Sequence, residues 1–75
     1  MKSVSYLDLR GVKCPLSWAR AKVRLEQMPR GGLLELVLDD PRGARDLPRA
    51  AESEGHLVVE TSRLPHGLWR LVIEN

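Results

Sequence analysis

Residues 4–17 read VSYLDLRGVKCPLS, and they divide into a predicted strand, a turn and the start of a helix. Apolar and polar residues alternate from Val4 to Leu9, which predicts a strand. Gly11 permits a turn, and Pro15 suits the first turn of a helix. Cys14, the single cysteine of the chain, therefore stands at a predicted helix start, where unpaired N–H groups and the helix dipole favour a thiolate.

The predicted first helix covers residues 15–28. No glycine interrupts this segment, and Pro29 with two following glycines supplies a stop. One apolar stripe at helical spacing gives the expected core face: Trp18, Ala21, Leu25 and Met28. Leu16 falls on roughly the opposite side, so we expect it to be exposed beside Cys14.

A second strand and a second helix follow. The alternation over 33–39 predicts a strand with three leucines on one face. After Asp39-Asp40-Pro41, which is typical of a turn, Asp46 is the expected cap of a short helix that ends near Glu54, before Gly55.

The last part of the chain predicts a hairpin. The segments 56–64 and 68–74 are rich in apolar and β-branched residues, and Pro65-His66-Gly67 between them are turn residues. The element order becomes β-α-β-α-β-β, which can form a two-layer α/β sandwich with both helices on one face of a four-stranded mixed sheet. Residues 1–75 are expected to form a single domain without a linker.

Composition narrows the function classes. Twelve basic and ten acidic residues give a net charge of +2, a balance that argues against direct nucleic-acid binding. We find neither a signal peptide nor an apolar run of membrane-spanning length, and one cysteine excludes an intramolecular disulfide, so we expect a cytoplasmic protein. His56 and His66 form no zinc-ligand spacing with Cys14, so no metal is expected.

Two sequence blocks resemble one family. The first is Asp8-x-x-Gly11-x-x-Cys14-Pro15, followed by a helix of the expected length. The second runs from Asp39-Asp40-Pro41 through Arg45-Asp46-Leu47-Pro48 to Gly55-His56. Together they resemble the TusA-like (SirA-type) sulfur-carrier family over nearly the whole chain.

The resemblance implies a function and its partners. Cys14 would be the catalytic residue of a sulfurtransferase that accepts sulfane sulfur as a persulfide and relays it to another protein. The implied partners are a cysteine desulfurase or other donor and a downstream acceptor, for example in tRNA thiolation, molybdenum-cofactor synthesis or sulfur oxidation. No metal or organic cofactor is implied.

Neighbouring residues have expected supporting roles. Arg10 and Lys13 would favour the anion of Cys14, and Pro15 would order the helix start. A partner surface is expected to include Leu16, Arg20 and Arg45. The family pattern usually runs Cys-Pro-x-Pro, whereas this chain has Ser17 in place of the second proline, which restores a backbone N–H and adds a hydroxyl near the thiol.

Two other functions fit the same residues. The basic first helix and a pI near 9.1 would suit a noncatalytic RNA-binding or regulatory module. A single thiol would also suit a redox sensor that forms intermolecular disulfides.

Overall fold

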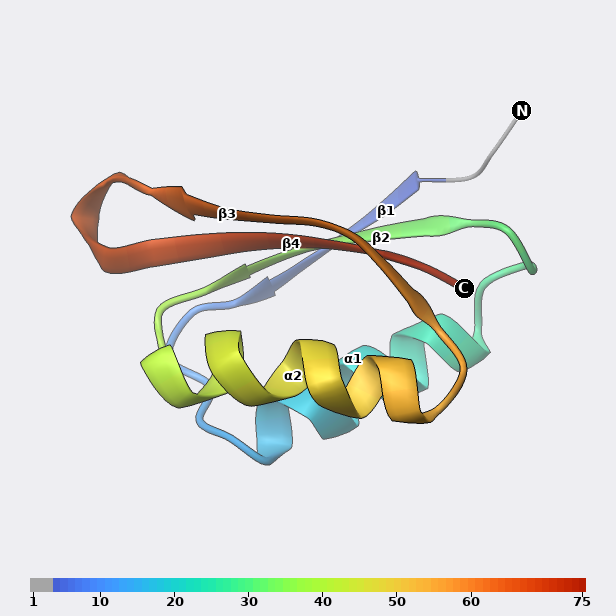
Figure 1. The fold of residues 1–75 in the computed structure, drawn as a ribbon, viewed down its shortest axis with the longest axis horizontal. Helices are drawn as coiled ribbons and strands as arrows, with labels where there is room; N and C mark the ends of the chain where they lie inside the picture. Colours follow the sequence, from blue (N-terminus) through green and yellow to red (C-terminus); the bar gives the residue numbers. More distant parts are fainter. Residues whose placement is uncertain (1–3) are drawn as a thin grey trace.

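The computed structural model describes residues 4–75, and their elements follow the predicted order. They are β1 (Val4–Leu9), α1 (Leu16–Glu26), β2 (Leu33–Leu38), α2 (Pro41–Ser53), β3 (Leu57–Leu64), a 3₁₀ turn (Pro65–Gly67) and β4 (Leu68–Glu74). Figure 1 shows both helices on one face of the sheet, which confirms the two-layer α/β sandwich.

The sheet is mixed, in the order β1-β2-β4-β3. β1 lies parallel to β2, while β4 is antiparallel to both β2 and β3. A parallel pair needs a crossover connection, and α1 supplies it. Because β1 and β2 run in the same direction, the loops that follow them leave the same edge of the sheet.

The core lies between the sheet and the helices. Leu34, Leu36 and Leu38 are fully buried and alternate with half-buried neighbours along β2. They belong to one cluster with Ala21 and Leu25 of α1, and Trp18 and Met28 pack against its margin, as the helical stripe predicts. Each buried leucine contributes about 2 kcal/mol through removal of apolar surface from water.

The predicted cap of the second helix is wrong. α2 begins at Pro41, and Asp40 is its N-cap, with a side chain that accepts a hydrogen bond from the N–H of Arg42 at 3.3 Å. Asp46 instead lies inside the helix and pairs with Arg45 at 2.9 Å. The physical reason is that aspartate before proline combines an N-cap acceptor with a residue suited to the first helical position.

Other boundaries differ by smaller amounts. α1 begins one residue later than predicted and ends at Glu26, because Pro29 disfavours helical backbone at the residue before it. β2 ends one residue earlier than predicted, and β3 begins one residue later. The hairpin strand β4 has its predicted bounds.

The final described residue closes the C-terminal end of α1. The side-chain amide of Asn75 donates to the carbonyl oxygens of Leu25 and Met28, both at 2.9 Å. Its backbone N–H donates to the oxygen of Gly32, and its own oxygen accepts from Gly31, also at 2.9 Å. The end of β4 is thereby tied to a helix that lies some 50 residues earlier in the sequence.

Candidate functional site

Cys14 lies half-buried at the start of α1, in the loop that connects β1 to this helix. The backbone around it is already helical in its hydrogen bonding, since the N–H of Ser17 donates to the oxygen of Lys13 at 3.1 Å. Pro15 follows Cys14 through a cis peptide bond and is the N-cap residue, without a side-chain hydrogen bond to the helix. No acidic residue lies in the first turn, so no carboxylate of α1 itself offsets the positive end of the dipole there.

Two aspartates that follow β2 hold the Cys14 loop in place. Both carboxylate oxygens of Asp39 accept the N–H of Gly11, at 2.9 and 3.0 Å. The Oδ2 atom of Asp40 accepts the N–H of Cys14 at 3.0 Å. Gly11 has a φ of +81°, a backbone conformation that glycine adopts without steric cost. Since β1 and β2 are parallel neighbours, the aspartates meet the loop at the shared edge of the sheet.

Asp40 combines a structural role with an electrostatic one. Its residue is only 6% exposed, and its side chain links the start of α2 to the Cys14 loop. The hydrogen bond from the Cys14 N–H lowers the pKa of this carboxyl below its usual value, although burial opposes the shift. Asp40 is therefore an anion at neutral pH, and its negative charge lies beside Cys14.

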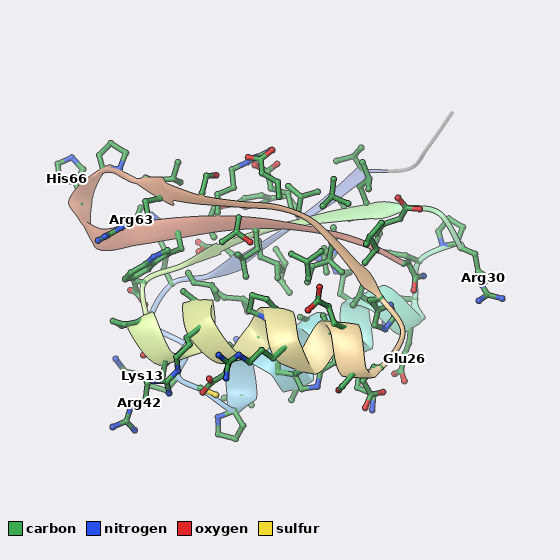
Figure 2. The ribbon with its side chains drawn as sticks, viewed as in Figure 1. Lys13, Glu26, Arg30, Arg42, Arg63 and His66 are labelled. Atoms are coloured by element: carbon green, nitrogen blue, oxygen red, sulfur yellow. The ribbon has the colours of Figure 1, made fainter. Side chains whose placement is uncertain are left out.

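Basic residues share this end of the molecule with Cys14. Figure 2 shows Lys13 and Arg42 at the same end of the molecule, both extending outwards. The positive charge of Lys13 helps to lower the pKa of Asp40. On α2, the pKa of Arg45 is raised mainly by its hydrogen bond to Asp46, and negative charge on Cys14 adds to the same effect. The fold thus brings Lys13 and Arg45 near the thiol.

Arg10 has a separate partner. Its guanidinium donates to the two carboxylate oxygens of Asp8, at 2.9 and 2.8 Å. This side-chain pairing lowers the pKa of Asp8 to about 2. The structure therefore places the Arg10 charge on Asp8, at the end of β1, rather than in a recorded contact with Cys14.

Ser17 lies between the two helices. Its side chain is fully buried, and within residues 4–75 its Oγ atom has no hydrogen-bond partner. Opposite it, Gly43 of α2 brings the two helix backbones close, because a β-carbon at position 43 would stand only 3.3 Å from Ser17 Oγ. A buried hydroxyl without a partner costs about 1–3 kcal/mol, so this arrangement is a destabilising feature of an otherwise apolar contact.

The outward face of α1 carries apolar side chains next to the site. Leu16 is 51% exposed, as the sequence predicts, and Val23 is 54% exposed. Arg20 lies between them and is also exposed. These residues are spaced so that they share one side of the helix, which makes a mixed apolar and basic strip that begins beside Cys14.

The described part of the chain holds neither a cluster of metal ligands nor a helix that could span a membrane. Residues 4–75 contain no group of three or more His, Cys, Asp or Glu side chains placed to bind a metal ion. None of the helices in this range is long and apolar enough to cross a bilayer.

Comparisons with known proteins agree with this geometry. The model of the family described as Sulfurtransferase TusA matches residues 5–75. A protein of Archaeoglobus fulgidus described as a candidate sulfur carrier is 35% identical over 68 residues, which cover 91% of this chain and 77% of the relative. A protein of the same description from Neisseria meningitidis serogroup B is 33% identical over 69 residues, 92% of both chains.

A solved structure supports the same assignment. The crystal structure of the SirA-like protein from Desulfitobacterium hafniense matches with a TM-score of 0.83 and 25% sequence identity. The match covers 93% of this chain and 95% of that protein. With a family match over almost the full length and relatives above 30% identity, the chain belongs to the TusA family of sulfurtransferases.

Proposed function

We propose that this protein carries sulfane sulfur as a persulfide on Cys14 and passes it to a partner protein. The single observation that carries the proposal is the placement of the half-exposed thiol at an uncapped helix start, in a loop held by two aspartates. Family membership and the descriptions of the relatives support a sulfur-carrier role. The cytoplasm, where thiols stay reduced, is the proposed place of action.

Loading is a thiol–persulfide exchange that needs no oxidant. The Cys14 thiolate attacks the outer sulfur of a donor persulfide, and a bond forms between Sγ and that sulfur. The sulfur–sulfur bond of the donor breaks, and the donor thiolate leaves with the bonding electron pair. Delivery repeats the exchange, with an acceptor thiolate as the nucleophile and Cys14 as the leaving group.

Partner docking would use the surface around the thiol. The exposed strip of Leu16, Arg20 and Val23 begins next to Cys14, and Arg45 lies on the neighbouring helix. A cysteine desulfurase is the proposed donor, and the acceptor belongs to a pathway such as tRNA thiolation, molybdenum-cofactor synthesis or sulfur oxidation. A half-exposed thiol suits this role because both donor and acceptor must reach its sulfur.

Mass spectrometry of the intact protein tests the proposal. After incubation with a cysteine desulfurase and free cysteine, the protein should gain the mass of one sulfur atom and lose it on treatment with a reductant. Cys14→Ser should gain none, while Ser53→Ala, altered at the far end of α2, should load normally. A wild-type protein that gains no sulfur from desulfurase or from a small-molecule persulfide would overturn the proposal.

The same preparations separate the other two functions. Salt-sensitive RNA binding that persists in Cys14→Ser would favour the noncatalytic module. A disulfide-linked dimer formed under mild oxidant and reversed by reductant, without sulfur loading, would favour the redox sensor.

A further inference from the structure

The contact between α1 and α2 holds a buried hydroxyl that the exchange chemistry does not use. Ser17 is fully buried, and its Oγ atom has no partner among the described residues. An alanine would occupy nearly the same space without burying a polar atom. A buried polar atom without a partner is unfavourable and rare in folded proteins. A hydrogen bond that Ser17 forms only in another state of the protein would explain why the hydroxyl is there.

The Asp40 carboxylate lies on the other side of the helix contact, next to Gly43. A β-carbon at position 43 would stand 3.3 Å from Ser17 Oγ and 3.7 Å from Asp40 Oδ2. Both oxygens therefore border the same small space, and any side chain at position 43 would begin inside it. Because residue 43 is glycine, nothing at that position separates the hydroxyl from the carboxylate.

The same carboxylate oxygen is bonded to the backbone of the thiol residue. Asp40 Oδ2 accepts the N–H of Cys14 at 3.0 Å, so a negative charge on Cys14 arises close to that of Asp40. Two cations also act on these groups: Lys13, from the same loop, on the Asp40 carboxylate, and Arg45, from α2, on Cys14. Both are exposed, so solvent screens their charges more than it screens the contact between the helices.

We propose that Ser17 is a positioning residue for sulfur transfer, whose hydroxyl donates to Asp40 when Cys14 becomes an anion. The added hydrogen bond spreads the carboxylate charge and so reduces its repulsion of the anionic sulfur. Only hydrogen bonds change in this step, and Ser17 keeps its proton. A proline at this position would offer no hydroxyl, so a chain with the usual Cys-Pro-x-Pro pattern could not form this hydrogen bond. The proposal deepens the proposed function and rests on it for its biological meaning.

Alkylation of Cys14 by iodoacetamide across a range of pH tests the role of Ser17 without any partner protein. Ser17→Ala should fold at least as stably as the wild type, since it removes a buried hydroxyl without a partner. Its alkylation at pH 7 should be roughly threefold slower, and its pH profile should move to higher pH. The matched control is Ser53→Ala, which loses a hydroxyl bonded to the oxygen of Ala50 at the other end of α2 and should keep the wild-type profile.

A double-mutant cycle shows whether Ser17 acts through Asp40. In the Asp40→Asn background, Ser17→Ala should leave the alkylation rate unchanged, because the carboxylate that it serves is absent. Gly43→Ala, which fills the space between the two oxygens, should slow alkylation as Ser17→Ala does. If Gly43→Ala fails to fold, the double-mutant cycle between positions 17 and 40 is sufficient to test the proposal. Superimposed profiles of Ser17→Ala and wild type, or a full Ser17→Ala effect in Asp40→Asn, would overturn the proposal.

Sulfur loading, measured in parallel, separates this proposal from the proposed function. If Cys14 accepts no sulfur but Ser17→Ala still slows alkylation, the sulfur-carrier function fails and the role of Ser17 stands. If loading is normal and alkylation is insensitive to Ser17, only the role of Ser17 fails.

Discussion

The two ends of α1 are held in opposite ways. At the C-terminal end, the neutral amide of Asn75 donates directly to the carbonyl oxygens of Leu25 and Met28. At the N-terminal end the N-cap residue, Pro15, makes no side-chain hydrogen bond to the helix, and the carboxylates of Asp39 and Asp40 bind the preceding loop instead. This difference shows that the N–H groups at the start of α1 stay free of a side-chain cap beside Cys14. The loop that carries Cys14 is stabilised instead by carboxylates that follow β2.

The largest expected effect on stability is at the C-terminal end. Asn75→Ala removes the hydrogen bonds from the side-chain amide to the oxygens of Leu25, Met28 and Pro29, so the free energy of unfolding should fall by about 2 kcal/mol and the melting temperature by roughly 10 °C. Thermal and urea unfolding measure this. Asn75→Asp, which has the same shape but no N–H donors, should be at least as destabilising. The rate of iodoacetamide alkylation of Cys14 in the folded fraction should not change. A changed rate would show that the two ends of α1 are not independent.

Asp40→Asn should alter both stability and reactivity. The neutral amide weakens the cap of α2 and the bond to the Cys14 N–H, so the melting temperature should fall by about 5 °C. Alkylation at pH 7 should become faster, because the negative charge beside the thiol is gone. Slower alkylation in a folded Asp40→Asn protein would contradict the electrostatic account of this end.

Acid should distinguish the two ends, because the side-chain carboxylates of Asp39 and Asp40 hold only the N-terminal end. The pKa of Asp40 is lower in the folded protein than its usual value near 3.8, mainly through the Cys14 N–H. Its contribution to stability is therefore present above pH 4 and is lost as the pH falls through the lowered folded value. In NMR spectra recorded from pH 7 towards pH 2.5, the amide of Cys14 should shift before that of Met28, whose N–H donates to the oxygen of Leu25 at the C-terminal end of α1. Simultaneous shifts would show that the ends are not independent.

The smallest effect is expected for the exposed pair of Asp8 and Arg10. The pKa of Asp8 is lowered to about 2 by the Arg10 hydrogen bonds, so this pair stabilises the folded protein above pH 4 and loses that effect between pH 4 and 2. Asp8→Asn should reduce the melting temperature by only about 2 °C at pH 7, since solvent screens an exposed pair. The difference between the variant and the wild type should shrink steadily as the pH falls from 4 to 2. A difference as large at pH 2 as at pH 7 would assign another role to Asp8.

Much of the fold follows from local patterns, but the second helix shows their limit. Alternation and helical spacing predict the strands and the core face of α1, because burial on one side of an element repeats with its own period. Gly43 and Pro48 both have low helix propensity, yet α2 runs through them from Pro41 to Ser53. Packing of Leu47 and Ala51 in the core offsets their unfavourable propensity, and this is a tertiary effect.

The site divides in the same way. The position of Cys14 at a helix start and the exposure of Leu16 follow from nearby residues. The bonds from Asp39 and Asp40 to the loop depend on the parallel pairing of β1 with β2, which no local pattern specifies. Ser17 shares the helical spacing of Ala21 and Leu25, which could have indicated its burial, but a serine hydroxyl is seldom buried without a hydrogen-bond partner. The role of Asn75 has no local signal.

The bond between Asp40 and Cys14 also bears on how the molecule assembles. It joins residues 26 positions apart, and the bond from Asp39 to Gly11 joins residues 28 apart, whereas β3 and β4 are linked by a short turn. Contacts between distant residues form late in folding, because the chain entropy of loop closure must first be overcome. A refolding chain should therefore complete its hairpin before its thiol acquires native surroundings. Brief pulses of alkylating reagent at different times during refolding would measure when Cys14 reaches its native reactivity.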